Sequence, residues 1–166
     1  MMFPKKNKRM SSQKIRSTWI KLCLCLWGMI IVKRDGKCQW CGSQGGLAGH
    51  HIVTRGSTKG NKLSWFLLEN GVALCLSCHG TAHGRGRKRT IRDYTEWENN
   101  YLKERDMSYE LMKRDYSVIA KMTKSDIELQ FNVLRAKCEG MRIPYAENKT
   151  YIRLTKKLAR SVYETA

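Results

Sequence analysis

The strongest feature of the hydrophobic pattern is an apolar run from Trp19 to Val32, in which only Lys21 and Gly28 are not apolar. Its uninterrupted part, from Leu22 onward, covers eleven residues, whereas a membrane span needs about 20. No small-residue cleavage site of a signal peptide follows the run before Lys33. The pattern therefore predicts a buried helix, or a helix followed by a strand, and no contact with a membrane.

The next elements are short. Residues 47–53 alternate moderately between apolar and polar side chains, which predicts a strand with His50 and His51 on opposite sides. Asn70-Gly71 is a favourable two-residue turn, and residues 74–83 predict a helix that Gly84 ends. Strands and helices in this order predict an α+β fold, and the apolar run is expected to pack against this unit.

The remainder of the chain has helical periodicity. Residues 125–128 resemble a capping box, and Gly140 is expected to end the helix that follows it. We expect the apolar stripes to be packing surfaces: Tyr94, Trp97 and Tyr101, then Ile127, Phe131, Leu134 and Cys138, then Leu154, Leu158 and Val162. The pattern divides the chain into a basic flexible arm (1–17), a domain with a leading helix (18–90) and a basic helical extension (91–166).

Charge adds a class of partner to this picture. The 166 residues include 32 Lys and Arg against 14 Asp and Glu, a net charge of +18. An excess of this size predicts a polyanionic partner, with nucleic acid favoured over an anionic membrane surface. We expect two polar, basic segments of the domain to contact phosphates: Arg55, Lys59 and Lys62 in one, and Arg85, Arg87, Lys88 and Arg89 in the other.

The cysteines indicate a metal. Cys38 and Cys41 form one CxxC pair, and Cys75 and Cys78 form a second. Two such pairs complete a tetrahedral thiolate shell, which predicts a structural Zn²⁺ site. The count of seven is odd, and zinc spacing fits a reducing cytoplasm better than a secreted disulfide framework. Cys23, Cys25 and Cys138 lie among apolar neighbours and are expected to be core residues.

All four histidines of the chain, His50, His51, His79 and His83, lie in the window from Cys38 to His83. His79 and His83 are four residues apart, so a helix presents both imidazoles on one face, within reach of a single ion. Isolated histidines are usually packing residues. This clustering instead predicts a second metal site.

With these residues in place, the segment resembles an HNH endonuclease of the zinc-containing type. The similarity rests on four elements in order: Cys38-x-x-Cys41, then Gly49-His-His-Ile-Val53, then Asn70, then Leu74-Cys-x-x-Cys-His79-x-x-x-His83. It implies a ββα-metal finger, two antiparallel strands and a helix around one catalytic ion. The Leu26-Trp27 segment and residues 101–105 are also similar to phage-encoded HNH proteins linked to recombination or packaging.

The resemblance implies residue roles. His51 corresponds to the general base, and a neutral imidazole suits that role at cytosolic pH. His50, His79 and His83 correspond to ligands of the catalytic ion, and Asn70 to a residue that braces the loop carrying His51; simple turn chemistry is the alternative for Asn70. Many relatives have Asp at the position of His50. An all-imidazole shell leaves the ion open among Mg²⁺, Mn²⁺, Ni²⁺, Co²⁺ and Zn²⁺.

The expected function is metal-dependent hydrolysis of DNA phosphodiester bonds, by nicking or by double-strand cleavage. A phage packaging or recombination protein is an expected partner, and the host cytoplasm would then be the location. The rival interpretation is a non-catalytic zinc module that binds nucleic acid, with the histidines as additional structural ligands. His51 argues against that rival, because neither metal shell needs it.

Overall fold

The structure is a computed structural model that describes residues 11–58, 62–86, 89–117 and 122–163, with side chains to residue 159. The helices are α1 (Ser12–Asp35), α2 (Leu76–Ala82), α3 (Ile91–Lys103), α4 (Tyr109–Tyr116), α5 (Lys124–Gly140) and α6 (Lys149–Tyr163). Two 3-10 helices, η1 (Leu63–Phe66) and η2 (Tyr145–Glu147), and two strands, β1 (Leu47–His51) and β2 (Gly71–Cys75), complete the described elements. The predicted α+β class is confirmed.

The two strands form an antiparallel sheet that leads directly into α2. Leu47 pairs with Cys75 at one end of the ladder, and His51 pairs with Gly71 at the other. The strand therefore includes Leu74 and Cys75, which the sequence pattern assigns to the helix, and α2 begins at Leu76, immediately after the strand. This ββα unit places the two CxxC pairs and all four histidines around one short sheet.

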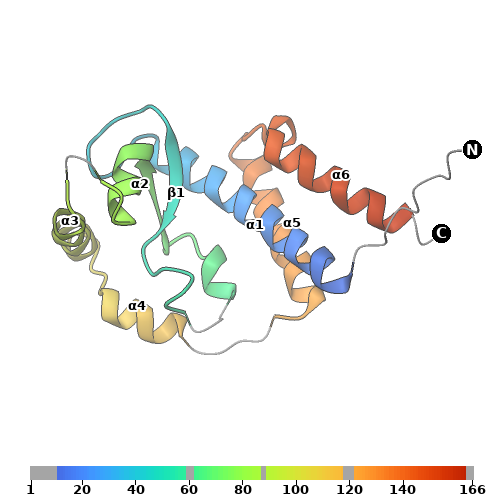
Figure 1. Cartoon of the computed structure of the whole chain (residues 1–166), viewed down its shortest axis with the longest axis horizontal. Helices are drawn as coiled ribbons and strands as arrows, with labels where there is room; N and C mark the ends of the chain where they lie inside the picture. Colours follow the sequence, from blue (N-terminus) through green and yellow to red (C-terminus); the bar gives the residue numbers. More distant parts are fainter. Residues whose placement is uncertain (1–10, 59–61, 87–88, 118–121, 164–166) are drawn as a thin grey trace, which may run out of the picture.

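Helix α1 is the longest element and connects the two ends of the molecule (Figure 1). It packs against both strands and also against α5 and α6. Its last turn is bonded to β2: Arg34 donates to the Gly71 carbonyl at 2.7 Å, and Asp35 accepts from the Ala73 N–H at 2.7 Å. By length and composition alone the helix could cross a membrane, but eight of its side chains are buried against the rest of the protein.

The approach of α1 to the sheet requires glycine. A Cβ atom on Gly71 would lie 2.5 Å from Ile31 Cδ1 and 2.7 Å from a Trp27 ring carbon, which real contacts do not allow. On the neighbouring strand, a Cβ on Gly49 would lie 3.0 Å from the Trp27 ring. Small residues on both strands therefore let the indole of Trp27 reach the sheet surface beside His51.

Helix α1 begins earlier than the sequence pattern indicated. Residues 12–17 belong to its first turns, whereas we had assigned 1–17 to a flexible arm. Ser11 caps the helix by accepting a hydrogen bond from the Lys14 N–H, and Ile15 packs against the hydrophobic core that α1 forms with α5 and α6. This part of the predicted arm therefore has both an N-cap residue and an apolar side chain that contributes to the core. Residues 1–10 lie outside the described part of the chain.

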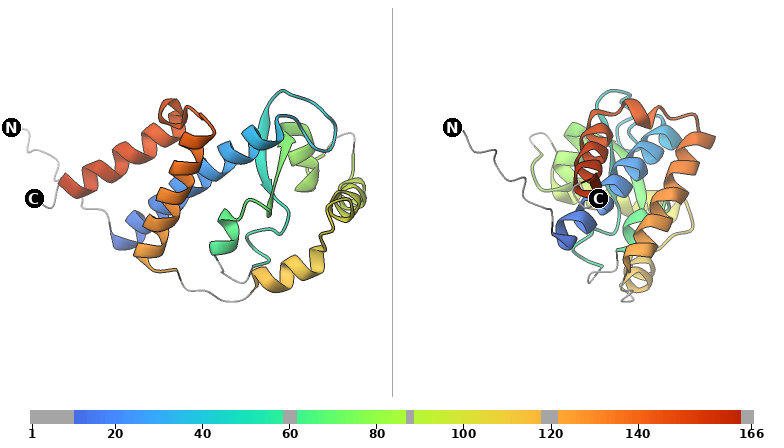
Figure 2. Two further views of the ribbon diagram at one scale, coloured as in Figure 1. Left: turned by 180° about the vertical axis from the view of Figure 1, so that it is seen from behind. Right: turned by 90° about the vertical axis from the view of Figure 1, so that its right-hand side faces the viewer.

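Two hydrophobic cores lie on either side of the sheet. One is formed by α1, α5 and α6, and the other joins the ββα unit to α3 and α4. Figure 2 shows α3 and α4 on the sheet side of the molecule and the α5–α6 pair at the opposite end of α1. The predicted extension 91–166 thus consists of two parts with different packing partners.

One of the two predicted helix-end signals in the extension was wrong in position. The capping box of α5 is made by Thr123 and Asp126 instead of Ser125 and Glu128, so α5 starts earlier. The prediction that Gly140 ends this helix is confirmed, since α5 ends at that residue, but the left-handed position after it is taken by Arg142 (φ 53°). Ile143 N–H donates back to the Cys138 carbonyl at 2.9 Å, which is the bond pattern that ends many helices.

Candidate metal centres and active site

The four CxxC cysteines converge on one point. Their sulfur atoms all lie within 4.8 Å of one another, and Cys41 Sγ is 3.7 Å from Cys75 Sγ. Zn–S bonds of about 2.3 Å in a tetrahedron place sulfurs about 3.8 Å apart. Three of the four cysteines are buried, with Cys41 exposed at the edge. The cluster therefore fits a closed structural site that could hold Zn²⁺.

The ionisation of these thiols also indicates a cation. Burial acts to raise the pKa of Cys38, but the backbone N–H groups of Cys75, Cys41 and Trp40 outweigh it and lower that pKa to about 7. Burial and the neighbouring sulfurs raise the pKa of Cys78. Four sulfurs at this separation cannot all be thiolates without a compensating positive charge, because like charges disfavour ionisation. A divalent ion would supply that charge.

A second cluster consists of His50, His79 and His83. One possible ligand nitrogen from each lies within 4.8 Å of the other two, and the ring centroids are 4.9–5.2 Å apart. His50 comes from β1 and is buried, whereas the other two come from α2 and its C-cap. Burial, followed by the charges of His79 and His83, lowers the pKa of His50 to about 3. Its imidazole is therefore neutral, which is the form that binds metals.

His51 lies in the same pocket but outside the three-histidine cluster. The pocket has a volume of about 410 Å³ and is also lined by Trp27 and Arg55. His51 Nε2 is 2.9 Å from the Trp65 carbonyl oxygen. A carbonyl only accepts, so Nε2 carries the proton, and Nδ1 of the neutral ring is left with a lone pair. Burial lowers the pKa of His51 to about 4, although the bond to Trp65 opposes this, so the ring is neutral near pH 7.

Two further contacts fix the ring of His51. The indole of Trp27 is stacked on it with centroids 4.0 Å apart and planes inclined by 8°. Trp27 is itself held by a hydrogen bond from Nε1 to the Leu67 carbonyl at 3.0 Å. The imidazole is therefore clamped by a carbonyl at its edge and by an indole on its face.

Asn70 is fully buried and bonded to the loop between the strands. Its Oδ1 accepts from the Val53 N–H at 2.8 Å, and its Nδ2 donates to the carbonyls of Val53 (3.2 Å) and Ser64 (3.1 Å). Ser64 precedes Trp65, whose carbonyl holds His51. The amide thus braces the loop between the strands, and this geometry goes beyond simple turn chemistry.

The described basic residues differ in their surroundings. Arg55 lines the histidine pocket, and its guanidinium lies 5.7 Å from the Trp65 ring; Lys62 lies 5.9 Å from the same ring. Arg85 is exposed after α2. Arg89 packs over Trp40 and approaches Cys78 Sγ at 3.9 Å, so it also supports the cysteine cluster. Lys59, Arg87 and Lys88 lie outside the described residues.

Sequence reasoning missed two contributors to the site. Trp27 was noted only as part of a segment similar to phage-encoded HNH proteins, and its contact with His51 had no signature, because one more aromatic residue in an apolar run is indistinguishable from a core residue. Tyr94 was assigned to packing, yet its ring lies 5.6 Å from that of His50, and its hydroxyl donates to Glu98 at 2.5 Å. Its position in a helical stripe gave no indication of this buried contact behind the metal cluster.

Comparison with known families agrees with this geometry. Residues 38–85 match the model of the HNH endonuclease family. No curated protein and no solved structure shows a significant match to the chain. The matched segment runs from the first cysteine of the four-sulfur cluster to just beyond His83 and contains every histidine. Residues 38–85 therefore match the HNH endonuclease family, and the four clustered cysteines fit the zinc-containing type of that family.

Proposed function

We propose that the protein is a metal-dependent endonuclease that hydrolyses phosphodiester bonds in DNA, with His51 as the general base. The observation that carries this proposal is the state of His51. The ring is neutral, its Nε2–H is occupied by the Trp65 carbonyl, and it lies in the same pocket as three clustered histidines without being one of them. A purely structural metal site has no use for a fourth imidazole held in this way.

The chain's own residues define the proton transfer. Nδ1 of His51 accepts a proton from the attacking water, whose oxygen bonds to phosphorus while the bond to the 3′ oxygen breaks. The leaving oxygen takes a proton from solvent, which gives a 5′-phosphate and a 3′-hydroxyl. The resulting imidazolium is hydrogen-bonded to the Trp65 carbonyl and lies against the anionic phosphate, so its pKa rises when substrate is bound. A weak base in the free protein thereby becomes a stronger one beside substrate.

His50, His79 and His83 would hold the divalent ion. When bound, such an ion neutralises a nonbridging phosphate oxygen and stabilises the developing charge on the leaving oxygen. The three imidazoles fit a borderline metal such as Mn²⁺, Ni²⁺, Co²⁺ or Zn²⁺ better than Mg²⁺, which prefers oxygen ligands. Arg55, at the edge of the same pocket, is suitably placed to bind a phosphate of the substrate backbone.

Plasmid cleavage tests the proposal. Wild-type protein, supercoiled DNA and each divalent ion in turn should yield nicked or linear product, and chelator should abolish it. His51→Gln is the informative variant, because its side-chain amide can still donate to the Trp65 carbonyl but has no site that accepts a proton. Removal of a general base costs about 10²–10⁴-fold in rate.

The controls separate loss of chemistry from loss of fold. His51→Gln should retain the thermal unfolding midpoint and bind one zinc per chain as tightly as wild type. Equal cleavage by His51→Gln and wild type would refute the role of His51. A chain that cleaves nothing with any ion and holds two inert zinc ions would instead be the non-catalytic binding module, and RNA run in parallel tests the preference for DNA.

A further inference from the structure

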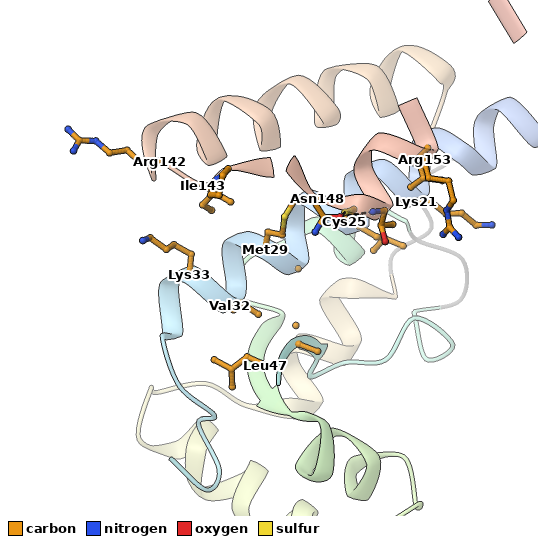
Figure 3. A pocket seen from close by; sticks show the side chains of 17 residues that line it. Lys21, Cys25, Met29, Val32, Lys33, Leu47, Arg142, Ile143, Asn148 and Arg153 are labelled. Carbon is orange, nitrogen blue, oxygen red and sulfur yellow. Dashed lines mark hydrogen bonds between the residues drawn. The ribbon is translucent and has the colours of Figure 1, made fainter. Parts of the chain in front are cut away.

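A groove runs alongside α1 next to the histidine pocket (Figure 3). Its volume is about 710 Å³, and it lies between α1, the start of β1 and the segment from Arg142 to Leu154. The floor is apolar and includes Leu24, Met29 and Ile143. All charged residues that line it are basic: Lys21, Lys33, Arg142 and Arg153. Figure 3 shows Lys33 and Arg142 at one end of the groove and Lys21 and Arg153 at the other.

The groove joins two other surfaces. Leu24, Gly28 and Gly49 line both the groove and the histidine pocket, so the two hollows are contiguous. At its other side, Lys21 and Arg153 also line a second hollow, of about 750 Å³, that is otherwise formed by α6 residues including Lys149, Lys156 and Lys157, again without an acidic residue. A continuous basic surface thus leads from the candidate active site to the exposed face of α6.

These cations are available for a ligand. All seven side chains are exposed, and none forms an ion pair with a described residue, whereas Arg34, Arg114, Lys124 and Arg135 do. Arg142 additionally occupies the left-handed backbone region, which costs an L-residue about 1–2 kcal/mol and is usually taken by glycine. A strained arginine at the edge of the groove is consistent with a binding role for its side chain.

We propose that this surface, which we call the α1–α6 tract, binds the sugar–phosphate backbone of the duplex that flanks the cleavage point; the proposal rests on the nuclease function above. Lys149 and Lys157 are eight residues apart on α6, a rise of about 12 Å. The same length of B-DNA carries about three to four phosphates on one strand. The groove contains no aromatic side chain on which unpaired bases could stack, so paired DNA is favoured over a single strand.

The salt dependence of binding provides the test. A triple variant, Arg153→Gln with Lys156→Gln and Lys157→Gln, removes three cations from the tract. Binding to a 30-base-pair duplex is followed by fluorescence anisotropy at 50–200 mM salt, without divalent ion so that no cleavage occurs. Each lost phosphate contact lowers the slope of log affinity against log salt by about 0.9, so the slope should fall by about 2.7. Between 50 and 200 mM salt, the affinity of wild type for the duplex should therefore fall by a factor about 40 times larger than the factor by which the affinity of the variant falls.

A matched variant controls for net charge. Lys103→Gln with Lys113→Gln and Lys137→Gln removes the same charge from α3, α4 and α5, away from the tract, and should leave the slope within about 0.5 of wild type. Equal slopes for the two triple variants would overturn the proposal. The proposal would also be overturned if the tract variant bound the duplex like wild type and differed from it only in binding to a single-stranded 30-mer, or to vesicles that contain anionic lipid. Unchanged unfolding midpoints verify that all three proteins are folded.

Binding and cleavage fail independently in this design. If plasmid cleavage is absent but the tract variant shows the lower slope, the nuclease assignment fails while the DNA-binding surface stands. If wild type cleaves and the tract variant binds like wild type, the nuclease assignment stands and the tract proposal fails.

Discussion

Replacement of Asn70 by alanine tests whether the loop between the strands holds His51, the proposed general base, in place. The substitution removes all three side-chain hydrogen bonds of a fully buried amide. Each bond contributes about 0.5–1.5 kcal/mol, and a buried group that loses its partner costs about 1–3 kcal/mol. We therefore expect the free energy of unfolding to fall by about 3 kcal/mol, which for a chain of this size lowers the melting temperature by about 6–12 °C.

The loss of cleavage activity should be larger than the loss of folded protein can explain. Ser64 and Val53 are the backbone anchors of the loop, and Trp65, one residue from Ser64, supplies the carbonyl that orients His51. At a temperature where Asn70→Ala is still folded, cleavage should fall by at least about tenfold, because a displaced carbonyl no longer fixes the ring. Asn70→Asp keeps the acceptor for Val53 N–H but loses both donated bonds and buries a charge, so it should be similarly impaired.

Calorimetry and plasmid cleavage of zinc-loaded protein provide the two measurements. Asn132→Ala is the matched control, since Asn132 is exposed on α5 and its replacement should change stability by less than about 0.5 kcal/mol. An Asn70→Ala protein that melts and cleaves like Asn132→Ala would refute the bracing role of the amide.

Two further predictions concern other parts of the molecule. Burial raises the pKa of Glu98 despite its bond from Tyr94, so its contribution to stability is fully present below pH 4.5 and is lost as pH rises through the folded-state pKa. Glu98→Gln should consequently melt above wild type at pH 7, with a difference that grows as pH rises from 4.5 through the folded-state pKa of Glu98, whereas the exposed control Glu96→Gln should not. A lower midpoint for Glu98→Gln would contradict the burial argument. Arg142→Gly should relieve the left-handed strain and stabilise the protein by up to about 1 kcal/mol while lowering the salt slope of duplex binding by about 0.9. Arg142→Gln should lower the slope without the gain in stability, and equal midpoints for these two variants would argue against strain.

The sequence predicted those parts of the site whose chemistry demands particular residues at particular spacings. Two CxxC pairs and His79 with His83 are constrained by the size of a metal shell, and the structure brings each set together. Asn70 was recognised through its resemblance to a family position, since turn chemistry explained it equally well. Packing contacts had no comparable signature: the stack of Trp27 on His51 joins residues 24 positions apart, and any large apolar residue would continue the same pattern.

Element ends were harder to predict than elements. Thr123 with Asp126 and Ser125 with Glu128 are both plausible caps two residues apart, and the packing of α5 against α1 selects between them. Gly140 is the last residue of α5, as predicted, but the left-handed position that follows the helix is occupied by Arg142 and not by a glycine. The extension is divided into an α3–α4 part and an α5–α6 part because the two helix pairs pack on opposite sides of a small sheet. The periodicity of a helix shows that it has an apolar face but not which side of the sheet that face contacts.

The indole that covers His51 belongs to Trp27 on α1, eleven residues before the first residue of the segment that matches the family. A fragment cut to the borders of that segment would retain both candidate metal clusters and His51. In that fragment, His51 would have lost one of its two supports, and the sheet would have lost the apolar helix that covers it. Transplanting this HNH segment into another protein would therefore require α1 to be included. Related chains that lack an equivalent helix must immobilise the same imidazole by some other means.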